Sequence, residues 1–349
     1  MAVTLNDIAN KAGVSVSTVS RVLNHKTKKY RISAETENLI VQAAKKLNYR
    51  PNQLARGLRL KKTHTIGLVV PDISNPFFAH VTRIIQTHAY KSGYSLIVCN
   101  TDEDINTELA QIELLISKGV DGFIVMPVGT TYVHFEKLMN DDVPLVLLDR
   151  SFDNLNINSV VVDNYAGAYK ATEYLISMGH ARIAIIQGLP DTYTNNARVQ
   201  GYLGALNDHG IALNSNYIVG KDFRKENGYI ETKFLLGLED PPTAIFTTSD
   251  LITLGVLEAI SEENIRVPED ISLVSFDDID FAPFLLAPLT AVRQPKEMMG
   301  EVAVKLLIDE LKLKKDHDHR KIVLKPELII RNSVKNLSSP SEITVSKVD

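Results

Sequence analysis

Short apolar runs of four to six residues recur through most of this chain and alternate with amphipathic segments of helical length. Strands that are buried on both faces have such continuous apolar sequences, because neither face meets water. Parallel strands also need a long crossover connection, which a helix usually provides. The pattern therefore predicts an α/β body of doubly wound parallel sheets. The predicted strands are 65–70, 95–99, 121–126, 144–148, 159–162, 182–187, 243–247 and 271–276.

The length of 349 residues exceeds what one hydrophobic core comfortably serves, so two or three units are expected. The first fifty residues lack the strand pattern and predict a small all-α head. The body is expected to form two lobes, with a helix over 164–178 opening the second lobe and a return to the first lobe after Pro295. The predicted boundaries are 1–50 for the head, 51–62 for a hinge, 63–162 and 293–320 for the first lobe, 163–292 and 321–332 for the second lobe, and 333–349 for a disordered tail.

The head has the sequence pattern of two helices joined by a glycine turn, followed by a third helix. Thr4 and Asp7 have the spacing of a helix cap, and Gly13 permits the left-handed backbone at a helix end. Ser15 can cap the second helix, and the third is expected from 33 to about 47. The apolar positions predicted to close this three-helix core are Leu5, Ile8, Ala9, Ala12, Val19, Val22, Leu23, Leu39, Ile40, Ala43, Ala44 and Leu47.

A polar stripe follows the second predicted helix. Its members Ser17, Ser20, Arg21 and Asn24 fall at i, i+3, i+4 and i+7. Such a stripe can present hydrogen-bond donors and acceptors to base edges in a major groove. The alternative is an ordinary solvated helix face, because polar residues at this spacing occur on most surface helices.

The charge is distributed very unevenly. Up to Lys62 the chain has thirteen Lys and Arg against three acids, which gives +10, whereas the whole chain is −4 and the remainder therefore −14. A basic head on an acidic body indicates that only the head meets a polyanion. Because neutralised phosphates supply most sequence-independent affinity for DNA, this asymmetry favours the DNA-reading interpretation.

The segment 52–59 behind the head is a short basic amphipathic stretch. Leu54, Ala55 and Leu58 lie on one side, and it is too short to be a stable helix alone. A segment that folds only on DNA would couple the head to the body, and Leu58 can wedge into a minor-groove step. From composition alone, a charged linker fits equally well.

Polar side chains follow most of the predicted strands. In doubly wound sheets, ligands bind beyond the carboxyl ends of the strands. Carboxylates, amides and arginine beside aromatic rings suit a neutral, sugar-like ligand. We assign Asp163 and Asp250 to helix capping rather than to ligand contact. The residues that follow strands are Asp72, Asn100, Asp102, Pro127, Asp149, Arg150, Asp163, Gln187, Ser249, Asp250, Asp277, Asp278 and Gln294, and the aromatic residues are Phe77, Phe78 and Phe223.

Two motifs of the head and hinge closely resemble the LacI/GalR family of bacterial transcriptional repressors: TLNDIANKAGVSVSTVSRVLN at 4–24 and NYRPNQLARGL at 48–58. The resemblance continues in PDISNPFF at 71–78, RVQGY at 198–202 and FDD at 276–278, and covers the chain to about Asn332. One departure is NHKTKKYRIS at 24–33, which is a few residues longer and more basic than is usual. Whether this loop makes the phosphate contacts of the family is therefore left open, although Lys28, Lys29 and Arg31 can attract DNA electrostatically.

The resemblance implies a periplasmic-binding-protein-like body and a homodimer. Its two heads would read half-sites of a pseudopalindromic operator in major grooves, with the hinges in the minor groove. Lobe closure on an effector would change the spacing of the hinges and so release the operator. The DNA-contacting residues predicted are Thr4, Leu5, Ser15, Val16, Ser17, Thr18, Ser20, Arg21, Asn24, Asn52, Ala55, Arg56, Leu58 and Arg59.

The resemblance also implies an effector site. Arg198 matches the arginine that grips ligand hydroxyls in sugar-responsive members, and Asp277 matches its acidic counterpart. Thr192 stands where purine-responsive members have another arginine, so a small carbohydrate is favoured over a purine. The alternatives left open are control by a phosphocarrier-type protein partner and a corepressor. The effector-binding residues predicted are Phe77, Phe78, Asp149, Arg150, Arg198, Phe223, Ser249, Asp277 and Gln294.

No motif for catalysis is present. The chain lacks G-x-G-x-x-G after a strand, a phosphate loop and a G-x-S-x-G elbow, so we predict neither an enzyme nor a cofactor. The single Cys99 excludes an intrachain disulfide, and no metal site is expected. Because no signal peptide or membrane-length apolar run is recognised, we expect a cytoplasmic protein without membrane contact.

Overall fold

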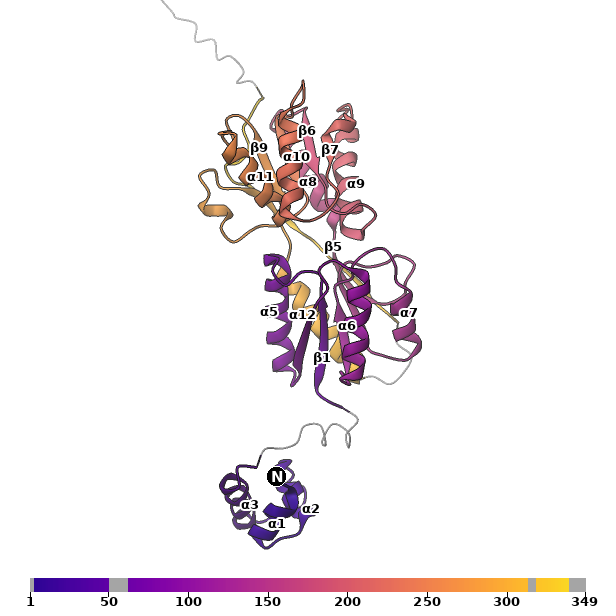
Figure 1. Ribbon diagram of the computed structural model, residues 1–349, viewed down its shortest axis with the longest axis vertical. Helices are drawn as coiled ribbons and strands as arrows, with labels where there is room; N and C mark the ends of the chain where they lie inside the picture. Colours follow the sequence, from indigo (N-terminus) through magenta and orange to yellow (C-terminus); the bar gives the residue numbers. More distant parts are fainter. Residues whose placement is uncertain (1–2, 50–61, 313–317, 339–349) are drawn as a thin grey trace, which may run out of the picture. The chain divides into compact units, whose positions relative to one another are not determined.

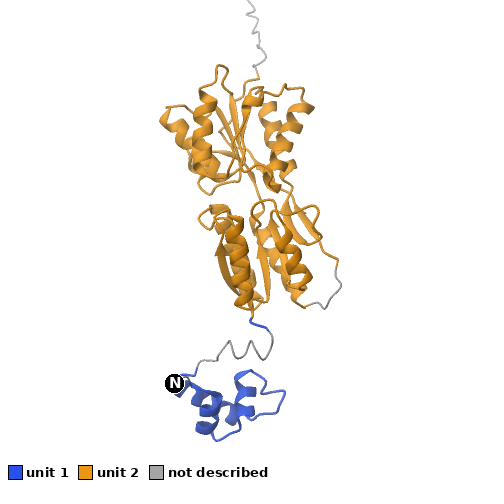
Figure 2. Ribbon diagram, turned by 45° about the vertical axis from the view of Figure 1, so that its right-hand side comes forward, with its two compact units in different colours: residues 1–63 blue, residues 64–349 orange. Residues whose placement is uncertain are grey.

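The structure is a computed structural model that describes residues 3–49, 62–312 and 318–338. It contains two compact units, one reaching to Thr63 and one starting at His64 (Figure 2). The five predicted hinge contacts lie outside the described residues: Asn52, Ala55, Arg56, Leu58 and Arg59.

The head contains the three predicted helices: α1 (Leu5–Ala12), α2 (Val16–Leu23) and α3 (Ala34–Lys46). At the start of α1, the Asp7 carboxylate accepts the Thr4 backbone N–H at 2.8 Å, while the Thr4 hydroxyl accepts the Asp7 N–H at 3.4 Å. Leu39 was predicted to belong to the core of the head, but this prediction is wrong because its side chain is 46% exposed. It lies one residue from Ile40 on α3, and a step of about 100° turns it off the buried face. The buried core comprises Ile8, Ala9, Ala12, Val19, Val22, Ile40, Ala43 and Ala44.

The first lobe of the body, which contains β1 in Figure 1, has a parallel six-stranded sheet of order β11-β5-β4-β3-β1-β2. Helix α12 packs on α5 and covers one face of this sheet, and α6 packs on β1 and β2. The strands are β1 (Thr65–Val70), β2 (Ser95–Asn100), β3 (Gly122–Val125), β4 (Leu145–Asp149), β5 (Asn158–Val162) and β11 (Lys321–Leu324), and the helices are α5 (Pro76–Lys91), α6 (Ile105–Ser117), α7 (Val133–Asn140) and α12 (Lys296–Lys312).

The second lobe repeats this architecture with the order β12-β10-β9-β8-β6-β7. All its strand pairs are parallel except β10 with β12. The strands are β6 (Ile183–Ile186), β7 (Ile218–Val219), β8 (Ala244–Thr247), β9 (Ser272–Phe276), β10 (Thr290–Arg293) and β12 (Glu327–Ile329), and the helices are α8 (Asn164–Ser177), α9 (Tyr193–Asp208), α10 (Lys225–Leu236) and α11 (Asp250–Glu262). The predicted strands and the two-lobed α/β fold are confirmed, and the short strands β7, β10, β11 and β12 were not predicted.

The chain crosses between the lobes three times: from β5 to α8, from β10 to α12, and from β11 to β12. The third crossing corrects a predicted boundary, because residues 321–324 belong to the first lobe. They form β11, which pairs with β5 from Lys321 opposite Ser159 to Leu324 opposite Val162. This pairing buries Leu324 and completes the edge of the first sheet.

The predicted start of the disordered tail at residue 333 is wrong, because the chain is still packed there. Ser333 is fully buried, and its hydroxyl donates to the Leu273 carbonyl while accepting the Thr290 N–H at 2.9 Å. Val334 packs against the core of the second lobe. These two anchors explain why the chain stays packed past 332. No helix among the described residues is long and apolar enough to cross a membrane.

Helices α8 and α9 pack closely because of a glycine. A Cβ built at Gly201 would lie 2.3 Å from the Tyr165 carbonyl oxygen and 2.9 Å from the Tyr169 nitrogen. Both contacts are with backbone, which cannot move aside without shifting α8. Close helix approach of this kind requires the smallest residue. Gly201 therefore fixes the distance between two helices that cover the second sheet.

Candidate functional site

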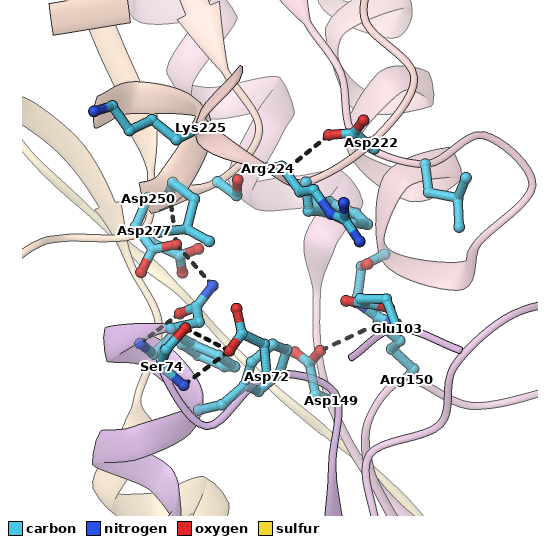
Figure 3. Close-up of a pocket in the computed structure, with 18 of the residues that line it drawn as sticks. Asp72, Ser74, Glu103, Asp149, Arg150, Asp222, Arg224, Lys225, Asp250 and Asp277 are labelled. Atoms are coloured by element: carbon cyan, nitrogen blue, oxygen red, sulfur yellow. Dashed lines mark hydrogen bonds and ion pairs between the residues drawn. The ribbon is translucent and has the colours of Figure 1, made fainter. Parts of the chain in front are cut away.

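A cavity of about 810 Å³ lies between the two lobes, where the carboxyl ends of both sets of strands meet (Figure 3). Its walls contain all nine residues predicted to bind an effector: Phe77, Phe78, Asp149, Arg150, Arg198, Phe223, Ser249, Asp277 and Gln294. Three further residues that follow strands also line it, namely Asp72, Asp102 and Asp250. Asn100, Pro127, Asp163, Gln187 and Asp278 follow strands but are absent from this lining.

The first-lobe wall is formed by the start of α5. Asn75 caps this helix by accepting the Phe77 N–H at 2.8 Å, and Pro76 occupies the first helical position, where no N–H is needed. The cap directs Phe77 and Phe78 toward the cavity, with ring centroids 5.2 Å apart and planes at 74°. The edge-to-face pair gives the site a rigid apolar wall.

Asp149 is the last residue of β4 and Arg150 follows it, and the two side chains have different roles. Arg150 donates to both carboxylate oxygens of Glu103, at 2.7 and 2.8 Å, and to the Pro127 carbonyl at 3.1 Å. Its guanidinium carbon also lies 5.4 Å from the Phe223 ring centroid, so much of its bonding capacity is already used.

The Asp149 carboxylate is buried, and its Oδ1 has no hydrogen-bond partner within the described part of the chain. Burial raises the pKa of this carboxyl to about 6, partly opposed by the charges of Arg150 and Arg198. A buried acceptor without a donor is costly, and native proteins seldom keep one without a purpose. Asp149 Oδ1 is therefore available to a donor that enters the cavity.

Arg198 is held rigidly in the second-lobe wall. Its Nε donates to Asn164 Oδ1 at 2.8 Å, and its Nη1 donates to the Thr248 carbonyl at 2.6 Å. The guanidinium carbon lies 3.8 Å from the ring centroid of Phe276, and the residue is only 4% exposed. Desolvation lowers the pKa of Arg198, and the nearby Asp277 and Asp149 charges oppose that change. The group remains a charged, pre-oriented donor.

Asp277 and Gln294 are two further side chains that line the cavity, and they are hydrogen-bonded to each other. Gln294 Nε2 donates to Asp277 Oδ1 at 2.6 Å, which leaves Gln294 Oε1 buried and without a partner among the described residues. Asp277 has a φ of 83°, an unusual backbone angle for a residue other than glycine. Such conformations cluster at ligand sites, where the surrounding structure enforces them.

Asp250 was expected to cap a helix and Ser249 to bind the effector, but the structure gives the capping role to Ser249. The N-cap of α11 is Ser249, whose hydroxyl accepts the Ile252 N–H at 3.3 Å. Asp250 is instead the first residue of α11, and its Oδ1 accepts the Leu251 N–H at 2.8 Å and Asn75 Nδ2 at 3.2 Å. The capping role predicted for Asp250 is therefore wrong, because the preceding serine already occupies the N-cap position. Asp163 does cap α8, as predicted.

The cavity wall is strongly acidic. Two of its four basic groups are already paired: Arg150 with Glu103, and Lys225 with Glu258 at 3.0 Å. An anionic ligand would meet repulsion from the remaining carboxylates. The arrangement therefore suits a neutral ligand rich in hydrogen-bond donors. The acids are Asp72, Asp102, Glu103, Asp149, Asp222, Glu226, Asp250 and Asp277, and the bases are Arg150, Arg198, Arg224 and Lys225.

Several residues that line the cavity were not predicted from the sequence. Asn75 could have been identified, since an asparagine before a proline is typical of a helix N-cap. Glu103 directly follows Asp102, which was identified beyond a strand. No local pattern marked Thr194 or Asp222.

The polar stripe of α2 that is predicted to contact DNA bases is partly exposed to solvent. Ser17 and Arg21 are exposed, whereas Ser20 and Asn24 are half-buried. Asn24 Nδ2 donates to the Ser20 carbonyl at 2.6 Å and so closes the end of α2. Ser15 caps α2 by accepting the Thr18 N–H at 3.2 Å.

The remaining predicted contacts of the head lie at the two helix starts. The Thr4 hydroxyl is bonded to the Asp7 carboxylate at 2.8 Å, and Leu5 is half-buried. Val16 is exposed beside the Ser15 cap. All these residues lie on, or cap, helices that share one apolar core, so the head holds them in fixed relative positions.

Comparison with known proteins identifies both parts of the chain. Residues 4–52 match bacterial regulatory proteins of the lacI family, and residues 172–334 match a periplasmic binding protein-like domain. The HTH-type transcriptional repressor PurR of Pasteurella multocida (strain Pm70) is 38% identical over 334 residues, which are 95% of this chain and 99% of the relative.

Solved structures agree with this match. A lac repressor dimer bound to operator and the anti-inducer ONPF superposes with a TM-score of 0.85 at 27% identity, over 96% of this chain and 100% of that one. A LacI family regulator from Enterococcus faecium with bound ribose has a TM-score of 0.71 at 29% identity, over 78% and 99%. With its helix-turn-helix head and its two-lobed body, the chain belongs to the lacI family of bacterial regulatory proteins and is a DNA-binding transcriptional repressor.

Proposed function

We propose that this repressor is controlled directly by a small neutral carbohydrate bound between its lobes. The observation that carries the proposal is the pair of buried acceptors without partners, Asp149 Oδ1 and Gln294 Oε1, on the cavity wall. Ligand hydroxyls would supply the missing donors and accept from Arg198. The rings of Phe77 and Phe78 offer the apolar surface against which a sugar face packs.

The head binds operator DNA through α2 in this proposal. Arg21 and Ser17 are exposed and would meet base edges, and the positive charge of the head would supply phosphate contacts. The salt dependence of binding should therefore be steep. Arg21→Ala should weaken operator binding and relax base preference while ligand binding persists.

The functional assembly in this proposal is a homodimer. Strand β2 is an edge strand of the first sheet, yet Ile97 and Val98 on it are exposed. Helix α6 packs beside β2 and exposes Leu114 and Ile116. An uncovered edge with apolar side chains needs a partner, and a second copy supplies one with two-fold symmetry. Two heads would then read two half-sites of a pseudopalindrome.

Ligand control requires that the cavity and the operator-bound state be thermodynamically linked. Lobe rotation around a bound sugar would alter the separation of the two hinge segments in the dimer, and with it operator affinity. Such linkage is reciprocal, so operator DNA must change ligand affinity by the same factor. We expect ligand binding to release DNA.

A purine is the second ligand class considered. The resemblance to purine-responsive members would place an arginine at 192, and this chain has threonine there. The Thr192 hydroxyl donates to the Leu189 carbonyl at 2.7 Å, within the turn that starts α9. The position therefore offers no charged donor to a base, which supports the carbohydrate.

The test is a thermal-shift screen of the full-length protein against neutral sugars, sugar phosphates and purines. A neutral sugar should raise the melting temperature by mass action, and sugar phosphates should do so less. Arg198→Lys should abolish the shift, because lysine cannot make both the Asn164 and the Thr248 contacts. Stabilisation by a purine alone would reject the carbohydrate. No response to any metabolite would favour a protein partner.

A further inference from the structure

The connection between α2 and α3 is anchored on the helix that carries Arg21. The Arg21 carbonyl accepts the Lys26 N–H at 2.9 Å, and the Lys26 carbonyl accepts the Tyr30 N–H at 3.2 Å. Positive φ angles at His25 and Arg31, of 55° and 51°, reverse the chain at the two ends of this turn. The backbone therefore holds Tyr30 at a defined place beside α2.

The side chain of Tyr30 lies against the guanidinium of Arg21. The Arg21 Cζ is 4.2 Å from the centroid of the ring, well inside the range of a cation–π contact. Lys29 Nζ lies at 5.9 Å from the same centroid, at the outer limit. Within the described part of the chain, no carboxylate pairs with Arg21.

The geometry leaves Arg21 free to recognise a ligand. A ring contact uses the face of the guanidinium, whereas the N–H donors point outward along its edge. Tyr30 is 43% exposed and is not among the residues packed on the core of the head. The ring is thus placed to orient Arg21 and lies outside the apolar core of the head.

We infer that Tyr30 is a positioning residue that fixes Arg21 for bidentate contact with a guanine edge and so sets the base preference of the head. The inference rests on the proposed operator binding by α2. An arginine loses much rotamer freedom when it makes such a contact, and a side chain that is already oriented loses less. The gain applies to the base contact, because phosphate contacts tolerate many orientations.

The experiment uses the full-length protein and two probes. One probe is the duplex that the unaltered protein selects from a randomised library, and the other is a scrambled duplex of equal length. Anisotropy titrations at fixed salt compare Tyr30→Leu, which removes the ring, with Tyr30→Phe, which keeps it. Tyr30→Leu should weaken binding to the selected duplex about threefold per head, or tenfold for two heads. The same variant should bind the scrambled duplex within about twofold of the unaltered protein, and Tyr30→Phe should retain full affinity.

Two controls separate positioning from other roles. In the Arg21→Ala background, Tyr30→Leu should have no further effect on the selected duplex. Lys28→Gln, which removes a charge from the same turn, should weaken both probes alike. Renewed selection with Tyr30→Leu should show relaxed preference at one base pair per half-site.

Three results would overturn the inference: equal losses on both probes, a Tyr30→Phe variant as weak as Tyr30→Leu, or an undiminished effect of Tyr30→Leu in the Arg21→Ala background. Failure of the unaltered protein to select any duplex is a different outcome. It would overturn the proposed function itself, and the role of Tyr30 with it.

Discussion

Asn75 and Asp250 belong to opposite lobes and share a hydrogen bond of 3.2 Å across the cavity. Asn75 is the N-cap of α5, and Asp250 is the first residue of α11. The buried Asp250 carboxylate therefore lies near the positive ends of two helices, one in each lobe. This hydrogen bond links the two walls of the cavity directly.

Asn75→Ser should loosen the contact between the lobes without unfolding α5. Serine is also a good N-cap residue, but its shorter side chain cannot reach Asp250. A hydrogen bond to this carboxyl contributes about 1 kcal/mol, so ligand affinity should fall roughly fivefold. Calorimetry of the variant measures this. Asn75→Ala is the control that also loses the cap and should lower the melting temperature further.

The stability of the body should depend on pH through Asp250. Burial, together with the charge of Asp277, raises the pKa of Asp250 from 3.8 to about 7. The folded protein therefore holds this proton more tightly than the unfolded chain does. The resulting stabilisation is complete below pH 3.8 and is lost as the pH rises through 7.

Asp250→Asn should remove that dependence, because the amide resembles the protonated acid at every pH. Melting temperatures of the two proteins should agree below about pH 3.8, and the variant should be the more stable by a few degrees at pH 8. A difference that is constant from pH 5 to pH 8 would show that Asp250 does not titrate in this window.

Ligand binding should depend on pH through Asp149. Its pKa is raised to about 6, and hydroxyl groups that donate to Oδ1 favour the ionised form. Sugar affinity should therefore be about tenfold lower at pH 5 than at pH 7. Asp149→Asn should bind weakly and without this pH dependence in the same calorimetric titration. Equal affinity of the unaltered protein at both pH values would contradict a role for the carboxylate.

Gly201→Ala should destabilise the second lobe by about 1–3 kcal/mol, because the added methyl meets the backbone of α8. Gly204→Ala is a matched control on the same helix. Its methyl would meet the Tyr165 hydroxyl, the far end of a side chain that can move aside. Urea unfolding should therefore show a clearly larger loss for Gly201→Ala, and similar losses would argue against the close packing of α8 on α9.

The fold was largely predictable because its signals are local. The buried strands are continuous apolar runs, and helix caps such as Thr4, Ser15 and Asp163 show where helices begin. Strands β7, β11 and β12 are mostly not buried and therefore lack a continuous apolar run, and β10 has only Ala291 and Val292 as apolar residues. Ser333 is held by side-chain and backbone contacts with residues far away in the sequence, which a linear pattern does not reveal.

Part of the cavity wall was predictable from the polar residues that follow strands, and Arg198 from the family resemblance, but the hydrogen bonds between the wall residues were not. The bond between Asn75 and Asp250 joins residues 175 positions apart. The pairing of Arg150 with Glu103 likewise depends on how two loops meet. Whether a polar residue is a cap, an ion-pair partner or an available acceptor is decided by three-dimensional neighbours, as the exchange between Ser249 and Asp250 illustrates.

The chain crosses between the two lobes three times, and these crossings restrict how the lobes can move relative to each other. Three adjacent covalent links resist sliding, so pivoting about the line through them is the motion that costs least. The parallel strands direct their carboxyl ends to the cavity, which places the amino end of β1 at Thr65 on the distant side of the first lobe. In the proposed mechanism, a slight tilt of the lobes around a bound molecule would therefore cause the largest displacement at Thr65, where the first strand of the body begins.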